Sequence, residues 1–150
     1  MLNDESRLIN SYTMKTGNNW GVGILILRSD GKTLIGKRTD NHLWCTPGGK
    51  VNIGETVLKG IIREVKEEVN LNIHSPELFD IHVGSFGNEK VWITFSFYTD
   101  DYSGTIRPQA AEMEELKWVN ILELLSLDLF LPTKMMLDKY LELHPEAVSA

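Results

Sequence analysis

The stretch TVLKGIIREVKEEVN, residues 56–70, constrains the fold of this chain most. Its apolar residues recur at helical spacing and form one stripe, which predicts an amphipathic helix with one buried face. They are Leu58, Ile61, Ile62, Val65 and Val69. Thr56 is a suitable N-cap for this helix. Asn70 follows the last apolar residue, at the point where helices often end in a left-handed residue, usually Gly and sometimes Asn. The sequence therefore predicts a helix that begins after Thr56 and ends at Asn70.

The same helix carries three glutamates on one edge. Because each residue of an α-helix advances by about 100° around the axis, Glu64, Glu67 and Glu68 share an arc of about 100° beside the apolar stripe. Like charges at these spacings repel by roughly 0.2–0.5 kcal/mol per pair, and the helix C-terminus disfavours anions. A hard divalent cation would reverse this balance, because Mg²⁺ prefers carboxylate and phosphate oxygens. The alternative is an acidic face that is simply solvated.

The residues before the helix predict two strands and a loop. Residues 22–28 are β-prone and almost continuously apolar, as in a buried strand, and residues 33–38 return as a second strand. The turn between them contains Gly31, which accepts a positive φ without strain. Residues 46–50, TPGGK, contain one proline and two glycines and are therefore predicted to form a loop.

Beyond the helix, the chain continues with further strands and helices. Residues 78–86 and 90–100 are typical of a hairpin, and residues 116–119 of a short strand. Residues 120–126 and 132–143 are predicted helices, the second with its proline in the first turn. Strands interleaved with helices in this way predict an α/β fold of the α+β type, with a mixed sheet and helices on both faces.

Length, charge and cysteine content limit the class of protein. A chain of 150 residues suggests one globular domain, here residues 20–150, with residues 1–19 as an N-terminal arm or an added edge strand. The net charge of −6 argues against nucleic-acid binding, which needs a basic surface. A single cysteine, Cys45, excludes an internal disulfide and fits a cytoplasmic protein. The sequence has no signal peptide and no apolar run of ~18 residues, so no association with a membrane is expected.

The helix and the loop before it form one longer motif. From Gly49 to Leu71 the chain reads GKVNIGETVLKGIIREVKEEVNL. This resembles the Nudix box, Gly-x5-Glu-x7-Arg-Glu-U-x-Glu-Glu-x-Gly-U, in which U is a bulky aliphatic residue. Every fixed position matches except Asn70, where the family has Gly, and Asn also tolerates a left-handed helix end. The resemblance implies the Nudix fold, in which a mixed β-sheet is sandwiched between helices.

The resemblance also implies a role for each matching residue. Glu64, Glu67 and Glu68 correspond to the ligands of the family's metal, which is Mg²⁺ with Mn²⁺ as a substitute. Arg63 corresponds to the arginine that orients the box carboxylates, and Glu55 to the loop acid that pairs with this arginine. The glycine loop at residues 48–49 corresponds to backbone that approaches the metal and the phosphates closely. Within it Gly48 is expected as a metal ligand and Gly49 as a structural residue.

Many members of the family add an acid on the loop before the last strand. The candidates in this chain are Glu112, Glu114 and Glu115. Glu112 is expected to take this role because of its distance from Trp118, and the alternative is that all three are surface charges. Glu64 or Glu112 is the expected general base. With Arg63 and Glu67, these two residues make up the expected catalytic set.

The resemblance implies hydrolysis of a nucleoside diphosphate linked to another group. A (deoxy)nucleoside triphosphate that yields monophosphate and pyrophosphate is the expected substrate, because signatures typical of the ADP-ribose, NADH and coenzyme A hydrolases are absent. Nucleotide sugars, ADP-ribose and dinucleoside polyphosphates are alternatives, as is a non-catalytic domain that senses nucleotides.

Arg38 and Lys50 are candidate phosphate contacts, with ordinary surface charge as the alternative. Trp44 is a candidate base contact or a core residue. Dimers are common in the family, so a homodimer is compatible with the resemblance.

Overall fold

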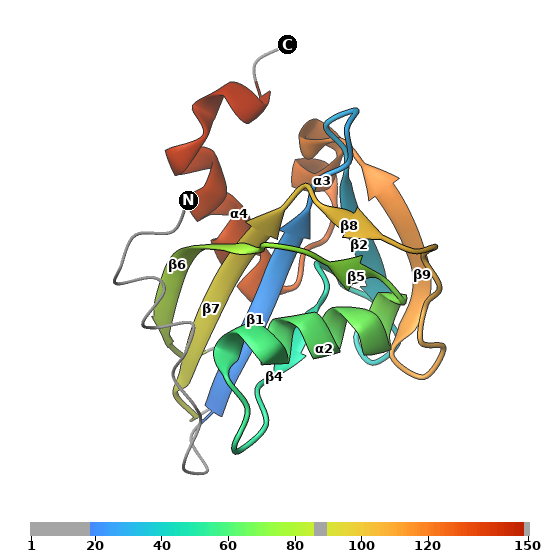
Figure 1. Ribbon diagram of the computed structural model, residues 1–150. Helices are drawn as coiled ribbons and strands as arrows, with labels where there is room; N and C mark the ends of the chain where they lie inside the picture. Colours follow the sequence, from blue (N-terminus) through green and yellow to red (C-terminus); the bar gives the residue numbers. More distant parts are fainter. Residues whose placement is uncertain (1–18, 86–89, 149–150) are drawn as a thin grey trace.

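The computed structural model describes residues 19–85 and 90–148 (Figure 1). Within these residues the main sheet has four strands, β4 (Gly48–Lys50), β1 (Asn19–Ile26), β7 (Trp92–Thr99) and β6 (Glu77–Gly84), in that order. β1 and β7 run parallel, and the other two pairs are antiparallel. The mixed sheet and the hairpin are therefore confirmed. The N-terminal arm lies outside the described residues, except for Asn19, which belongs to β1.

The remaining strands form two smaller sheets. One is antiparallel and has the order β3 (Trp44–Cys45), β2 (Thr33–Arg38), β9 (Met113–Val119). The other pairs β5 (Asn72–Ile73) with β8 (Tyr102–Ser103). Gly31 has a φ of 84°, as its place in the turn before β2 requires. The single sheet expected from the sequence is thus divided, and the short strand expected at residues 116–119 begins earlier, at Met113.

The interpretation of residues 46–50 as a loop is wrong in its second half. Gly48 to Lys50 form β4, which pairs with β1 through the register Gly23↔Gly48 and Gly21↔Lys50. Two glycines and a lysine have little intrinsic preference for a strand. The strand forms because the neighbouring β1 offers backbone hydrogen-bonding groups, which the local sequence does not reveal.

The described residues also contain three α-helices, namely α2 (Val57–Val69), α3 (Ile121–Ser126) and α4 (Leu131–Leu143). A 3₁₀ turn follows at Pro145–Val148. α2 covers one face of the main sheet and α4 covers the other (Figure 1). This explains why the end of β1 is apolar on both faces: Ile24 and Ile26 belong to the core cluster under α2, and Leu25 packs with Met136 and Tyr140 of α4. Within the described residues, no helix is long and apolar enough to cross a membrane.

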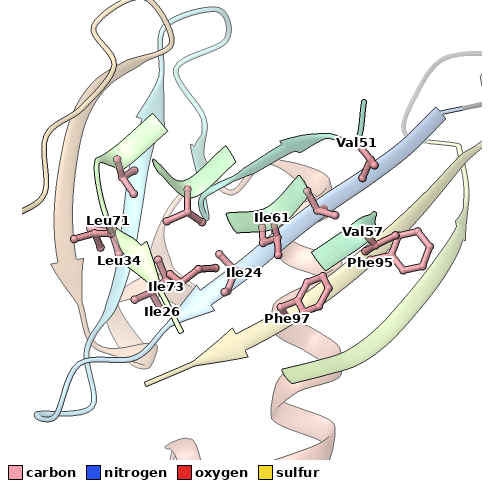
Figure 2. Close-up of a cluster of buried hydrophobic side chains, with 13 residues drawn as sticks. Ile24, Ile26, Leu34, Val51, Val57, Ile61, Leu71, Ile73, Phe95 and Phe97 are labelled. Carbon is pink, nitrogen blue, oxygen red and sulfur yellow. The ribbon is translucent and has the colours of Figure 1, made fainter. Parts of the chain in front are cut away.

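The core under α2 fixes the orientation of this helix. Ile61 and Val57 point towards the sheet, where Ile24, Phe95 and Phe97 are buried (Figure 2). Both predicted ends of α2 are confirmed. The side chain of Thr56 accepts a hydrogen bond from the N–H of Lys59 at 3.1 Å. Asn70 has the left-handed angles φ 66° and ψ 28°. The glutamate edge of α2 is therefore placed beside β4 by packing rather than by its charges.

Candidate active site

Arg63 lies at the centre of an ion-pair network on α2. Its Nε and Nη2 donate to the carboxylate of Glu55 at 2.7 and 3.0 Å, and Nη2 also donates to the carbonyl of Lys50 at 2.9 Å. Its Nη1 donates to Glu64 and to Glu67, each at 3.0 Å. The hydrogen bonds from Arg63 lower the pKa of Glu55. One guanidinium thus ties α2 to the preceding loop and orients two of the three glutamates.

The two glycines before Lys50 allow the loop backbone to come close to its neighbours. Glycine has no Cβ, and a Cβ added to Gly49 would lie only 2.3 Å from Cδ of Glu64. A Cβ on Gly48 would lie 2.2 Å from the carbonyl oxygen of Val22 in β1. Gly48 faces backbone atoms that cannot move aside, so glycine is required there, whereas a side chain at position 49 would displace the carboxylate of Glu64. We call the side of α2 that carries Glu64, Glu67 and Glu68 the acidic edge. It therefore lies directly against the backbone of β4.

Glu68 is the buried member of the acidic edge, with 6% of its surface exposed. Its Oε1 accepts a hydrogen bond from the backbone N–H of Gly48 at 3.2 Å. Burial raises the pKa of Glu68 to about 8, and the charges of Glu112 and Glu64 act in the same direction. Burial also raises the pKa of Glu64. A carboxylate in this position is stable only with a proton or a nearby cation.

Glu112 reaches the acidic edge from a distant part of the chain. It lies just before β9, and its backbone carbonyl accepts a hydrogen bond from the N–H of Thr39 at 3.0 Å. Its charge raises the pKa of both Glu64 and Glu68, which shows that its carboxylate lies near theirs. Glu114 instead forms an ion pair with His42. The structure thus brings the first of the three candidate acids to the acidic edge and pairs the second elsewhere.

The donor set suits a hard divalent cation. Carboxylate oxygens of Glu64, Glu67, Glu68 and Glu112 lie on or beside one edge of α2, next to the bare backbone of Gly48. In the part of the chain that the structure describes, no three His, Cys, Asp or Glu side chains are already grouped around one point. Arg63 holds two of the acids, and the Gly48 N–H holds Glu68. Binding of a cation therefore requires these carboxylates to move closer together, and each has a second oxygen that can bind the cation while the first keeps its present hydrogen bond.

A cavity of about 370 Å³ opens beside the acidic edge. Residues of β1, β4 and β7, the segment before α4 and the first turns of α4 line it. Its charged lining residues are Glu68, Lys50 and Arg38, and its largest apolar ones are Trp92, Phe130 and Met136. The volume falls within the range of roughly 300–1,000 Å³ that is usual for small-molecule sites. The cavity therefore combines a charged part with an apolar part.

Of the three predicted substrate contacts, two line the cavity and the third does not. Lys50 and Arg38 both line the cavity. Asp40 holds the guanidinium of Arg38 with two bonds of 2.9 and 2.7 Å, and this guanidinium lies 4.2 Å from the centre of the Phe130 ring. Trp44 is not among the lining residues. Its ring packs in a second core cluster, with Lys117 4.6 Å above it, so the structure favours the core alternative for this residue.

Two aromatic residues of the cavity were missed by sequence reasoning. Trp92, Thr94 and Ser96 alternate along β7, so their side chains lie on the same face of the strand, and this face lines the cavity. The alternation was visible in the sequence, but nothing showed which face is open. Phe130 comes from the segment before α4, and its ring lines the cavity only because α4 packs on the sheet. No local pattern marks this residue.

Comparisons with known proteins identify similar sequences and structures. A family model described as NUDIX domain matches residues 17–140. The uncharacterized Nudix hydrolase YvcI of Bacillus subtilis is 32% identical over 102 residues, which are 64% of this chain and 63% of that protein, slightly less than two thirds of its length. The RNA pyrophosphohydrolase of Pelagibacter ubique is 30% identical over 67% of this chain and 75% of its own length. A crystal structure of a MutT Nudix hydrolase from Burkholderia pseudomallei matches with a TM-score of 0.75 and 26% identity, over 83% of this chain and 98% of that one.

Proposed function

Because the chain belongs to the Nudix family of hydrolases, which act on acid anhydrides, we propose that it cleaves a (deoxy)nucleoside triphosphate to the monophosphate and pyrophosphate with Mg²⁺. The position of Glu68 is the observation that carries this proposal. Glu68 belongs both to the acidic edge of α2 and to the wall of the cavity. A nucleotide in the cavity would therefore place its phosphates beside the carboxylates, with Arg38 and Lys50 as neighbouring cations.

The proposed reaction follows from the arrangement of these side chains. Glu64, Glu67, Glu68 and Glu112 would hold Mg²⁺, which spreads the charge on the phosphoryl oxygens and lowers the pKa of an attacking water. Arg63 fixes the orientation of Glu64 and Glu67. The backbone of Gly48 and Gly49 in β4 lies directly beside these carboxylates, so phosphates held by the metal would also lie close to this strand.

Hydrolysis needs one proton acceptor and one leaving group. The water oxygen forms a bond to one of the two phosphorus atoms joined by the α–β bridge, the P–O bond from that atom to the bridging oxygen breaks, and the other half of the substrate leaves with the electron pair of that bond. The proton of the water passes to a carboxylate, and Glu64 and Glu112 are the two candidates because both face the same edge of α2. Replacing each by Gln and comparing the pH profiles of turnover would distinguish these two bases.

The 5′-triphosphate end of an RNA is a second candidate substrate. The relative from Pelagibacter ubique is named an RNA pyrophosphohydrolase. Cleavage at the phosphates would be the same as for a free nucleotide. The net charge of −6 disfavours a broad surface for RNA, so contacts in this case would be confined to the first nucleotides.

A panel of substrates with product identification tests the proposal. It contains the nucleoside triphosphates, ADP-ribose, a nucleotide sugar, a dinucleoside polyphosphate and a 5′-triphosphate RNA, each with Mg²⁺ or with EDTA. We expect monophosphate and pyrophosphate from the triphosphates with Mg²⁺ only, and a loss of orders of magnitude in the Glu67→Gln variant. Cleavage of ADP-ribose with no action on triphosphates would move the substrate to another class. No cleavage of any compound would favour a domain that only binds nucleotides.

A further inference from the structure

We propose that Asn70, the box position at which this chain departs from the Nudix pattern, is a positioning residue that holds the loop of Glu112 against the end of α2. The inference rests on the proposed function in one respect, since it takes Glu112 to be part of the metal site. It concerns residues 104–112, the segment that leads from β8 to β9. We call this segment the Glu112 loop.

The Glu112 loop is hydrogen-bonded to the last turn of α2. The backbone N–H groups of Arg107 and Gln109 donate to the carbonyls of Val69 and Glu68, each at 3.0 Å. The last four carbonyls of a helix have no partner within the helix, so these two bonds satisfy groups that would otherwise need water. The loop and the end of α2 are therefore complementary along their backbones.

Asn70 adds a side-chain bond to this contact. Its Nδ2 donates to the carbonyl oxygen of Thr105 at 3.0 Å. Its own backbone is left-handed, with φ 66°, a conformation that both Gly and Asn adopt readily. Gly at this position would end α2 equally well but would leave Thr105 without this donor. Asn70 therefore combines the usual helix end with a second contact that the family residue cannot make.

Hydrogen bonds within the Glu112 loop also position Glu112 itself. The N–H of Glu112 donates to the carbonyl of Gln109 at 3.0 Å. The side-chain amide nitrogen of Gln109, in the orientation that lets it donate, lies 3.0 and 3.3 Å from the two carboxylate oxygens of Glu112. Since the backbone of Gln109 is bonded to the carbonyl of Glu68, the carboxylate of Glu112 is placed relative to the turn that carries Glu68. Asn70 secures the first part of the same loop.

The experiment measures ion binding and backbone protection without turnover. We would compare the unmutated protein with Asn70→Gly, Asn70→Asp, Glu112→Gln and the double variant Asn70→Gly/Glu112→Gln. Calorimetry gives the Kd of Mn²⁺ for each nucleotide-free protein, and hydrogen exchange gives the protection of the amides of Arg107 and Gln109. Asn120→Gly is the control, because Asn120 also stands at a helix end and uses its side chain in a hydrogen bond, but at the start of α3 and to the N–H of Glu123 rather than to the Glu112 loop.

We expect both single Asn70 variants to weaken Mn²⁺ binding by about tenfold, the lower end of the effect of groups that orient metal ligands. The two loop amides should exchange faster in these variants. Asp keeps the tolerance for a left-handed backbone but has no donor, so it should behave like Gly. In the Glu112→Gln background the Asn70→Gly change should not weaken Mn²⁺ binding further, because the ligand that it positions is gone. Asn120→Gly should alter neither measurement.

Several results would overturn the inference. One is an unchanged Kd of Mn²⁺ together with unchanged hydrogen exchange in Asn70→Gly. Another is that Asn70→Gly weakens Mn²⁺ binding as much in the Glu112→Gln background as it does alone. A third is full Mn²⁺ affinity in Asn70→Asp. An unmutated protein that binds no Mn²⁺ would also remove the role of Asn70. Failure of the proposed function gives a different pattern, since no nucleotide would be cleaved while the coupling between Asn70 and Glu112 in Mn²⁺ binding remained.

Discussion

Burial of the Glu68 side chain disfavours the negative charge of its carboxylate. Its pKa is raised from 4.5 to about 8, mainly because the carboxylate is buried. The native state therefore binds a proton at Glu68 more tightly than the unfolded chain does. Between pH 4.5 and about 8 only the native state carries this proton, so the contribution of Glu68 to stability is present at low pH and is lost as the pH rises.

Glu68→Gln should therefore affect stability in a pH-dependent way. In the metal-free protein we expect the free energy of unfolding to rise at pH 8 and to change little at pH 5, because Gln resembles the protonated acid and its carbonyl can still accept from Gly48. Urea denaturation in EDTA at both pH values measures this, with Glu142→Gln as a control on an exposed helix position. An equal effect at the two pH values would mean that the native Glu68 is already ionised.

At the scale of elements, α2 and the loop before it behave as one unit that Arg63 holds together. Arg63 makes bonds to the carboxylates of Glu55, Glu64 and Glu67 and to the carbonyl of Lys50 at the same time. Arginine can do this because its planar guanidinium carries five N–H donors, whereas lysine has one nitrogen. The conformation of the loop before α2 and the orientation of Glu64 and Glu67 therefore both depend on the side chain of Arg63.

Arg63→Lys is expected to lower the free energy of unfolding by about 1–3 kcal/mol, the usual cost of losing hydrogen bonds to charged groups. Turnover should fall as well, because Glu64 and Glu67 lose their common partner. Denaturant unfolding and steady-state kinetics measure the two effects. Arg28→Lys is the matched control, because Arg28 is also bonded to a carboxylate, that of Asp30, but at the surface. Similar losses in both variants would show that the Arg63 network has no special role.

The same elements show which features the sequence can predict. The length of α2, its N-cap at Thr56 and its end at Asn70 follow from local rules, because spacing and capping act within a few residues. β4 could not be predicted, since Gly48 and Gly49 become a strand only by pairing with β1. The Nudix resemblance indicated that Glu112 could join the site, but its contact with the end of α2 depends on the path of a loop that carries no periodic pattern.

At the scale of the whole molecule, the candidate site lies where distant segments meet. The acidic edge comes from α2, Glu112 from the loop before β9, and the cavity from β1, β4, β7 and the start of α4. The charged wall of the cavity includes Glu68, whereas Phe130 contributes an aromatic ring from the other helical layer. Under the proposed function, we therefore expect α2 to serve the phosphates and the region of α4 to serve the base.

Phe130→Ala tests this separation. Stacking of a base on an aromatic side chain is worth roughly 1–3 kcal/mol, so we expect KM for nucleoside triphosphates to rise by about tenfold or more while kcat changes only a few fold. Steady-state kinetics with one purine and one pyrimidine triphosphate measure both constants. Leu131→Ala is the control, because Leu131 is the next residue along the chain, is 48% exposed and does not line the cavity. A collapse of kcat with an unchanged KM would instead place Phe130 in the reaction itself, since only interactions that are stronger in the transition state than in the ground state change kcat.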